Sequence, residues 1–241
     1  MPRARTKSTG ERLLELVEAA IVVFSRQGYE KSQIADVAKE MGVSVGTVYN
    51  YVESKEALFD LVLRHTSKES PAWLDEIQVP VRTPKLETTL GFLKGIFGQK
   101  NKWPVLSAAL KQKEAEDPRA ELESIIRELY ALMHGHRTGL RLLLKSALSF
   151  PGMTEIFVFG LRKRLLNALV KYINLRVAAG QFAKPKDTFA TASVITQTVA
   201  WANLQRPHDP HLSKITDAAV EEAILELMVN GLLKRSDIPK S

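Results

Sequence analysis

Residues 42–56 read GVSVGTVYNYVESKE, and this stretch decides the fold that the sequence predicts. Gly42 provides a turn, and Ser44 can cap the helix that follows it. Val48 and Val52 are four residues apart, so on a helix both point to the same side, toward a core. The opposite side is polar and aromatic. Such a surface suits a polyanionic partner better than it suits a core.

Three further helices surround this short one. From Glu11 onward, apolar residues recur at helical spacing, and Gly28 follows them as a C-terminal cap. Ser32 can cap a second helix that ends at Gly42, and Ser54 can cap a fourth helix. The second and third helices then form a helix-turn-helix, and the first helix supplies the third leg of a small bundle.

The outward side of the third helix has the composition of a recognition helix, whose N-terminal residues read base edges in the DNA major groove. Asn50 has the amide geometry to pair with an adenine edge, and Gly46 allows close approach of the backbone. Tyr49 can contact a thymine methyl group or a phosphate. The expected DNA contacts are Ser44, Val45, Gly46, Thr47, Tyr49, Asn50, Tyr51 and Lys55, with Thr47, Tyr51 and Lys55 at phosphates.

Composition sets limits on this interpretation. The net charge is +7 and the pI is about 9.5, but residues 1–66 contain nine basic and nine acidic side chains. A DNA partner must therefore be argued from individual residues. The absence of cysteine excludes disulfides, thiol catalysis and thiolate metal sites. No apolar run is long enough to span a membrane, and the polar N-terminus is not a secretory signal, so a cytoplasmic protein is the simplest expectation.

The run from Glu11 to about Leu63 resembles the DNA-binding domain of the TetR family of transcriptional repressors. The matching residues are Ala20, Phe24, Gly28, Tyr29, Ile34, Val37, Ala38, Gly42, Val43, Ser44, Gly46, Thr47, Val48, Tyr49, Tyr51, Ser54, Lys55, Glu56 and Leu58. The chain departs from the family pattern at Ser32-Gln33, where a Thr-Thr pair is frequent, at Ala35 and at Val52. The resemblance implies that Gln33 is a further DNA contact. The resemblance covers about the first quarter of the chain.

The resemblance implies a homodimeric repressor that a small apolar or amphipathic effector releases from double-stranded DNA at a palindromic operator. The predicted domains are a basic arm at 1–10, a DNA-binding domain at 11–67 and an effector-binding and dimerisation domain at 68–241. The arm, with Arg3, Arg5 and Lys7, either enters a minor groove or is a disordered terminus.

The fold class expected for the whole chain is all-α. After a proline-punctuated connector, apolar helical runs are predicted at roughly 85–99, 103–116, 119–149, 153–179, 187–205 and 213–234. Several of them have a proline at or near the start, where a helix tolerates it.

Large apolar residues spread over these runs are candidates for an effector pocket, although most residues of this kind are simply core residues. The predicted pocket residues are Phe92, Phe97, Trp103, Leu106, Leu110, Met133, His136 and Phe157, with Leu129 and Phe159 as further candidates. The segment His134-Gly135-His136-Arg137 could form a polar pocket wall or a solvated helical edge. A zinc site is not favoured, because histidines two residues apart lie on different faces of a helix.

The last two helical runs predict self-association. The first is rich in Ala, Ser and Thr, and the second is apolar around much of its circumference, which indicates burial on more than one side. The residues expected at a four-helix dimer interface are Ile195, Val199, Trp201, Ala223 and Leu227. The alternative is a larger core within one chain.

The sequence supports two alternative functions to different degrees. A helical enzyme or chaperone-like binder is not supported, because the sequence has no phosphate-cradling glycine loop, nucleophile elbow or metal-spaced histidine cluster. No catalytic residue, metal or cofactor is therefore predicted. The alternative that remains open is a DNA-binding protein of the same fold that works without an effector.

Overall fold

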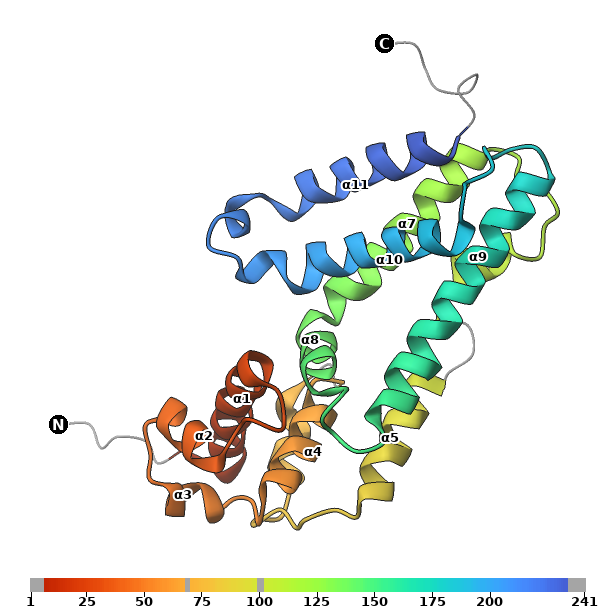
Figure 1. Cartoon of the computed structure of the whole chain (residues 1–241). Coiled ribbons are helices and arrows are strands. Elements are labelled where there is room, and N and C mark those ends of the chain that lie inside the picture. The colour runs from red at the N-terminus through yellow and green to blue at the C-terminus, as the bar shows by residue number, and fades with distance from the viewer. Residues whose placement is uncertain (1–6, 68–69, 99–101, 234–241) are drawn as a thin grey trace. The chain divides into compact units, whose positions relative to one another are not determined.

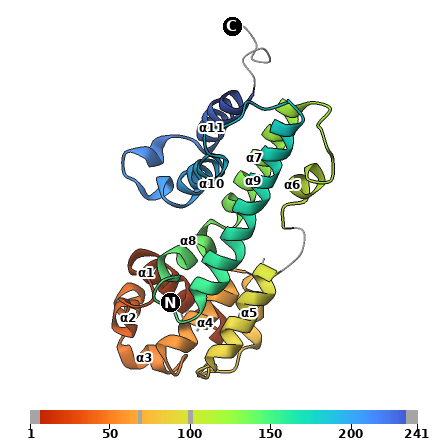
Figure 2. The same ribbon diagram turned by 45° about the vertical axis from the view of Figure 1, so that its right-hand side comes forward.

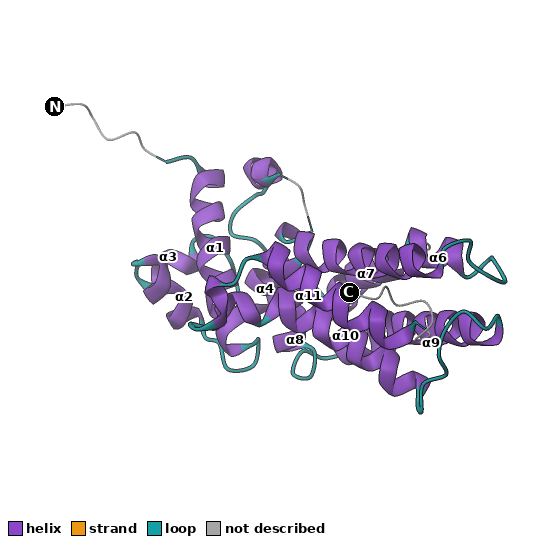
Figure 3. Ribbon diagram, turned by 90° about the horizontal axis from the view of Figure 1, so that it is seen from above, coloured by secondary structure: helices purple, strands orange, loops and turns teal. Residues whose placement is uncertain are grey.

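The chain folds into helices joined by short turns (Figure 1), in a computed structural model that describes residues 7–67, 70–98 and 102–233. Within these ranges every regular element is helical (Figure 3), and the only β-type pairs are two isolated bridges, Val52 with Val81 and Phe182 with Leu233. The prediction of an all-α chain is confirmed. None of the helices in the described ranges is long and apolar enough to cross a membrane.

The chain divides into two compact units. The first contains residues 1–97 and 138–157, and the second contains residues 98–137 and 158–241. These units are defined by packing and do not coincide with the predicted functional domains, 11–67 and 68–241, which remain a prediction.

The first unit is built around the predicted helix-turn-helix. Its elements are α1 (Thr9–Gln27), α2 (Ile34–Met41), α3 (Val45–Tyr49), α4 (Lys55–His65), the 3-10 helix η1 (Pro71–Glu76), most of α5 (Leu86–Gly98) and most of α8 (Arg137–Ser146). Helix α1 packs against α2, α4 and η1, and α2 packs against α3. The rings of Phe24, Tyr29, Phe59 and Phe150 stack or pack edge-on within this unit at centroid distances of 4.7–6.3 Å.

Local capping signals determine where these helices begin and end. Gly28 ends α1 with φ = 81°, and Gly42 ends α2 in the left-handed region, which glycine adopts without a Cβ clash. The hydroxyl of Ser44 accepts a hydrogen bond from the Thr47 amide at 3.1 Å. The hydroxyl of Ser54 accepts one from the Ala57 amide, also at 3.1 Å. These four caps are as predicted.

Two details of this region differ from the sequence prediction. Ser32 does not cap α2, because its buried hydroxyl donates to the Gly28 carbonyl at 2.6 Å, and α2 begins at Ile34 after the N-cap Gln33. Helix α3 is only five residues long, so Val52 lies beyond it, in the bridge with Val81. Val48 and Val52 are nevertheless fully buried, as predicted.

The second unit packs its helices around one apolar core. Its elements are α6 (Pro104–Ala109), α7 (Pro118–Gly135), α9 (Lys163–Ala178), α10 (Thr188–Leu204), η3 (Arg206–His208), η4 (Leu212–Lys214) and α11 (Asp217–Leu232). A π-helical segment, η2 (Thr154–Arg162), precedes α9 and continues directly into it. Helix α10 packs against α7, α9 and α11 (Figures 1 and 2).

Three of the predicted helical runs have different limits in the structure. The run 119–149 is divided at His136, which caps α7 before α8 begins. The run 153–179 begins as a π-helix, and the run 103–116 contains only the six residues of α6. Periodicity at 3.6 residues marks helical chain, but it does not locate a one-residue interruption or a change of helix type.

A buried ion pair joins α6, α7 and α9. The guanidinium of Arg176 is fully buried and donates to the Glu121 carboxylate at 2.7 and 2.9 Å. It also donates to the carbonyls of Ala109, Gln112 and Lys113. Because charge and donors are all matched, the pair is tolerated in an apolar core.

A second charged cluster lies at the start of α11. Asp217 forms ion pairs with Arg137 and with the buried Arg206, and its backbone carbonyl accepts a hydrogen bond from the Tyr130 hydroxyl at 3.0 Å. Burial opposes the charge of this carboxyl, but the hydrogen bond from Arg137 and the nearby cations lower its pKa overall. The cluster therefore joins the start of α11 to Arg137 and Arg206 through a carboxylate whose charged form is favoured.

Candidate nucleic-acid interface

The structure places the predicted recognition residues on one surface of α3. Val45 and Tyr49 are 41% and 48% exposed, and Gly46 and Asn50 are exposed beside them, whereas Val48 is fully buried. The helix has only five residues, and the burial of Val48 leaves the residues on its other side exposed to solvent, as the sequence spacing predicts. The helix thus presents an amide, a phenol ring and a glycine backbone together.

Ser44 and Thr47 have a structural role as well as the predicted one. Their hydroxyl oxygens are 2.8 Å apart, and Ser44 also accepts the Thr47 amide hydrogen. This arrangement fixes the N-terminus of α3. Ser44 is exposed and Thr47 half-buried, so both remain near the surface where DNA contacts are predicted.

A hollow of about 510 Å³ borders this surface. It lies where the start of α2, the outer side of α3 and the start of α4 meet. Its lining residues are Ser32, Gln33, Ile34, Ala35, Val45, Tyr49, Glu53, Ser54, Lys55 and Glu56. Gln33, the N-cap of α2 and also a predicted DNA contact, therefore lies at the same surface as Val45 and Tyr49.

Lys55, which is predicted to contact a phosphate, is hydrogen-bonded within the chain. Its ammonium donates to the backbone carbonyls of Tyr29, Glu30 and Ser32 at 3.1, 3.4 and 3.2 Å, and it lies 4.4 Å from the centre of the Tyr29 ring. An ammonium group has three N–H donors, and here each has a carbonyl partner. Lys55 therefore closes the turn between α1 and α2.

Tyr29 and Glu56 form a second link across the same turn. The Tyr29 hydroxyl donates to the Glu56 carboxylate at 2.6 Å. Burial, followed by this hydrogen bond, raises the pKa of Tyr29 well above its usual range, and the same bond lowers the pKa of Glu56. The phenol stays neutral and the carboxylate charged, so a negative charge remains beside the α3 surface.

No sequence pattern predicts that the connector between η1 and α5 pairs with the segment after α3. The Val81 amide donates to the Tyr51 carbonyl at 2.8 Å, and the Glu53 amide donates to the Val81 carbonyl at 3.0 Å. These bonds join segments about thirty residues apart, and no local motif encodes such a pairing. Tyr51 itself is half-buried beside this connector.

The predicted pocket residues do not gather in one unit. Phe92, Phe97 and Phe157 belong to the first unit, where the rings of Phe97 and Phe157 are 6.0 Å apart and both residues are buried. In the second unit, Leu106 and Leu129 are buried core residues, and the side chains packed around that core include Trp103, Leu110 and Met133. Their role as the lining of an effector pocket remains a prediction.

His136 and Phe159, two further candidates for the pocket, are exposed in the structure. His136 is exposed at the C-cap of α7, and Phe159 is 60% exposed. The neighbouring His134 is exposed as well, and its ring nitrogen is 2.7 Å from the Arg137 guanidinium. This segment is a solvated helical edge, the alternative to a pocket wall. The described residues contain no cluster of metal-ligating side chains.

A hollow of about 550 Å³ in the second unit involves none of the predicted pocket residues. It lies along α6 and α7. Its lining residues are Pro104, Val105, Ala108, Ala109, Gln112, Ala120, Glu121 and Ser124.

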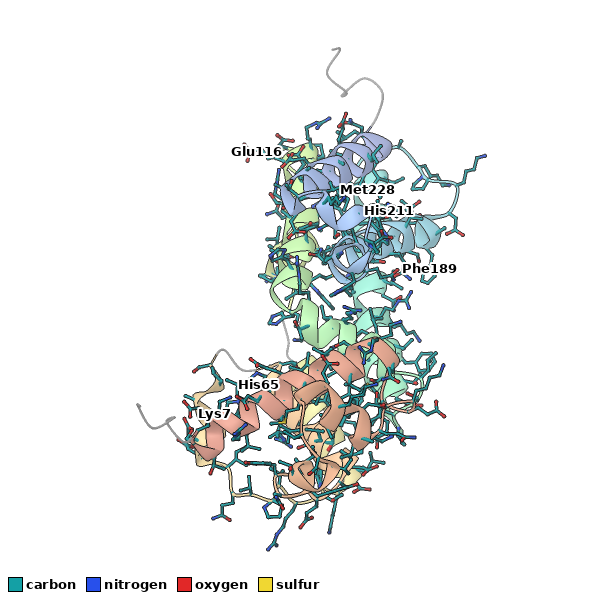
Figure 4. The ribbon with its side chains drawn as sticks, turned by 90° about the vertical axis from the view of Figure 1, so that its left-hand side faces the viewer. Lys7, His65, Glu116, Phe189, His211 and Met228 are labelled. Carbon is teal, nitrogen blue, oxygen red and sulfur yellow. The ribbon has the colours of Figure 1, made fainter. Side chains whose placement is uncertain are left out.

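The residues predicted at a dimer interface fall into two groups. Ile195 and Val199 are 2% and 0% exposed and pack in the core of their own unit, so they cannot form an outer contact surface. Trp201, Ala223 and Leu227 are exposed, and Leu227 is 71% exposed. The side chains of α10 and α11 are drawn in Figure 4, which labels the exposed Phe189 on α10.

Of the predicted N-terminal arm, Arg3 and Arg5 lie outside the described residues. Lys7 is described, and its ammonium forms an ion pair with Glu15 on α1. The charge of Lys7 is thus paired within the chain. Whether the arm contacts DNA or is a disordered terminus remains a prediction.

Comparison with known proteins identifies the N-terminal region. Residues 16–62 match the model for bacterial regulatory proteins of the tetR family. The HTH-type transcriptional regulator LuxR of Vibrio harveyi is 39% identical over 75 residues, which cover 31% of this chain and 36% of that protein. The chain thus matches only about a third of the length of such curated relatives.

Two solved structures share the fold over nearly the whole chain. The ketosteroid transcriptional regulator KstR2 of Mycobacterium tuberculosis has a TM-score of 0.56 at 19% identity, covering 97% of this chain and 98% of that one. AibR, solved in complex with isovaleryl coenzyme A and operator DNA, has a TM-score of 0.51 at 16% identity, covering 90% and 97%. Both likenesses extend the common fold into the second unit. Residues 16–62, which contain the helix-turn-helix, thus form a domain of the tetR family of bacterial regulatory proteins.

Proposed function

We propose that this chain is a transcriptional regulator that binds DNA through α3, and that it acts as a dimeric repressor released from a palindromic operator by a small molecule. The observation that carries the DNA-binding part is the exposure of Val45, Gly46, Tyr49 and Asn50 on one side of α3, within the segment that matches the family. TetR-family regulators are DNA-binding proteins without enzymatic activity, and no catalytic role is proposed here. A cytoplasmic location remains a prediction.

The direct test of the DNA-binding face is substitution within it. Asn50→Ala and Tyr49→Ala are each expected to cost about 1–3 kcal/mol of binding to a selected operator and to relax base preference. Gln205→Ala is the matched control, because Gln205 is an exposed amide outside this face. Unchanged affinity and base preference in both α3 variants would show that α3 does not read DNA.

Dimerisation is supported by apolar side chains that the chain leaves uncovered. Val194 on α10 is 56% exposed, Trp201 37% and Leu227 on α11 71%. Small residues accompany them, since Ala219, Ala223 and Gly231 recur at four-residue intervals with Leu227. Large exposed apolar patches mark interaction sites, and two helices of this kind can form a four-helix interface with a second copy.

A two-fold dimer would explain a palindromic operator. Its two copies of α3 would need to lie about 34–36 Å apart to enter successive major-groove turns. Operator symmetry would then follow from protein symmetry.

An effector would act by preferring one arrangement of the dimer. A ligand weakens DNA binding only to the extent that it binds the DNA-incompetent state more tightly. Apolar or amphipathic molecules are the expected class. The test is a thermal-shift screen with such compounds, coenzyme A thioesters included, followed by measurement of DNA release. Consistent failure to find a ligand that does both would favour the alternative, an effector-independent DNA-binding protein of this fold.

A further inference from the structure

We propose that the connector formed by residues 78–85 is a second DNA-contacting element, in which Arg82 binds a backbone phosphate beside the bases faced by α3. This inference rests on the proposed function, because it requires that α3 binds DNA. The ligand chemistry is that of a duplex phosphate, an oxyanion that a guanidinium can bind through two parallel N–H donors.

The connector is fixed to the segment that follows α3. Val81 exchanges hydrogen bonds with both neighbours of Val52, donating to the Tyr51 carbonyl at 2.8 Å and accepting from the Glu53 amide at 3.0 Å. Tyr51 is one of the residues predicted to contact a phosphate. The backbone next to Arg82 is therefore held against the end of the recognition element. Figures 1 and 2 show the connector along the same edge of the first unit as α3.

A second attachment follows immediately after Arg82. The Thr83 amide donates to the Glu53 carboxylate at 2.9 Å, and the Thr83 hydroxyl donates to the Ser54 hydroxyl at 2.7 Å. Ser54 is the cap of α4, so this attachment joins the connector to the start of that helix. Arg82 lies between two anchored residues, and consecutive Cα atoms are only about 3.8 Å apart. Its backbone is consequently held in place while its side chain stays exposed.

Several of the other cations in this region have partners within the chain, although the exposed Lys31 and Lys39 form no ion pair among the described residues. Lys55 is hydrogen-bonded to three carbonyls. Among the described residues of α1 and α4, those paired with carboxylates are Lys7 and Arg12 with Glu15, Arg26 with Glu40, and Arg64 with Asp60. By contrast, Arg82 forms no ion pair with any residue of the described ranges, and residues 78–85 contain two basic side chains and no acidic one.

Negative charge beside α3 means that a cation at this position would favour DNA binding. DNA that approaches Tyr49 and Tyr51 also approaches the carboxylates of Glu53 and Glu56, which line the hollow beside α3. Like charges at such short range oppose binding. An arginine fixed beside Glu53 offsets this repulsion and adds a phosphate contact. Arg82 supplies this charge from outside residues 1–66, in which basic and acidic side chains are equal in number.

The first experiment measures the salt dependence of DNA affinity. An operator is selected with the wild-type chain from a random duplex library, and affinities for it and for an unrelated duplex are measured over a range of salt concentrations. Each phosphate contact contributes about 0.9 to the slope of log K against log [salt], so Arg82→Gln should reduce the slope by about 1.8 per dimer. It should weaken both duplexes by a similar factor, since a phosphate contact carries no sequence information.

Two variants control this measurement. Lys94→Gln removes the same charge from an exposed position on α5 in the same unit and should leave the slope unchanged. Arg82→Lys keeps the charge and should retain most of the slope. If Arg82→Gln and Lys94→Gln behave alike while the wild-type chain binds its operator, the connector proposal is overturned and the proposed function stands. If the wild-type chain binds no duplex, the connector proposal and the proposed function are both overturned.

A proximity measurement gives an independent readout. The chain contains no cysteine, so Arg82→Cys introduces a single attachment point for an iron-chelate DNA-cleaving reagent. The labelled protein should cleave the operator at the flank of each half-site, whereas label placed by Lys94→Cys should give much weaker cleavage. Equal cleavage from both positions, or none from residue 82 on bound DNA, would contradict the placement of the connector.

Discussion

Lys55 organises the turn between α1 and α2. Its ammonium is shared among three backbone carbonyls and lies over the Tyr29 ring, and Tyr29 in turn donates to Glu56. Lys55 and Glu56 are consecutive residues in the first turn of α4, and both form hydrogen bonds with the turn between α1 and α2. Lys55 and Glu56 together therefore hold the turn against the start of α4.

Lys55→Met should therefore destabilise the fold as well as weaken DNA binding. Three charge-assisted hydrogen bonds are lost, partly offset by hydration of the freed carbonyls, which gives an expected loss of about 1–2 kcal/mol in the free energy of unfolding. The measurement is chemical denaturation, with Lys31→Met, at an exposed position, as the control. Unchanged stability together with lost DNA affinity would instead identify Lys55 as a phosphate contact.

His65 gives a prediction about pH. Burial lowers its pKa below the ordinary value of 6.5, although the nearby Glu18 carboxylate acts in the opposite direction. The unfolded chain then binds a proton more readily than the folded one, so this residue's contribution to stability is complete above pH 6.5 and is lost as the pH falls through the folded pKa. His65→Gln should flatten the pH dependence of stability below pH 6.5, and His211→Gln, at an exposed site, should not. Parallel pH profiles for both variants would contradict this assignment.

At the scale of elements, a charged pair holds α6, α7 and α9 together. Arg176 on α9 binds the Glu121 carboxylate on α7 and the carbonyl end of α6, and its side chain is fully buried. An ion pair of this kind contributes little by comparison with apolar packing. Removal of one partner is nevertheless costly, because the other charge remains desolvated.

Arg176→Met should accordingly lower the free energy of unfolding by about 3–5 kcal/mol. The control is Arg127→Met, which removes a half-exposed arginine from its pairs with Glu221 and Glu222 and should cost no more than about 1 kcal/mol. Denaturant unfolding followed by circular dichroism measures both. A similar small loss in the two variants would show that Glu121 is solvated without its partner.

The elements also show which features can be predicted from sequence. Gly42, Ser44 and Ser54 act within a few residues of themselves, so their caps follow from local pattern. The bonds of Lys55 and Val81 connect segments 23 to 30 residues apart, and nothing in the neighbouring sequence specifies the partner. The break at His136 escaped prediction for another reason, because α7 and α8 are each regular and only one residue separates them.

The same distinction applies to the candidate dimer surface. Small residues on α10 and apolar residues around much of α11 leave several possible contact faces, and the sequence cannot tell which of them the chain itself covers. Ile195 and Val199 are covered, while Val194 and Leu227 are left exposed. Only the tertiary packing separates an inner from an outer face on such a helix.

For the whole molecule, Leu227→Glu should convert the proposed dimer into a monomer. A charge in the centre of an apolar interface must be desolvated without a partner, which costs more than most interfaces can offset. Light scattering at micromolar concentration measures the molecular mass. Leu148→Glu is the matched control, since Leu148 is 87% exposed and lies in the first unit. A wild-type chain that is monomeric under these conditions would overturn the dimer proposal.

The central claim, that a dimer reads DNA with two copies of α3, is tested most directly by selection from a random duplex library with the wild-type chain. The account predicts an inverted repeat whose half-site centres are about 10 base pairs, or 34–36 Å, apart. It further predicts that Asn50→Ala loses the preference within each half-site. Absence of any enriched sequence, or enrichment of a site without two-fold symmetry that Asn50→Ala still recognises, would contradict it.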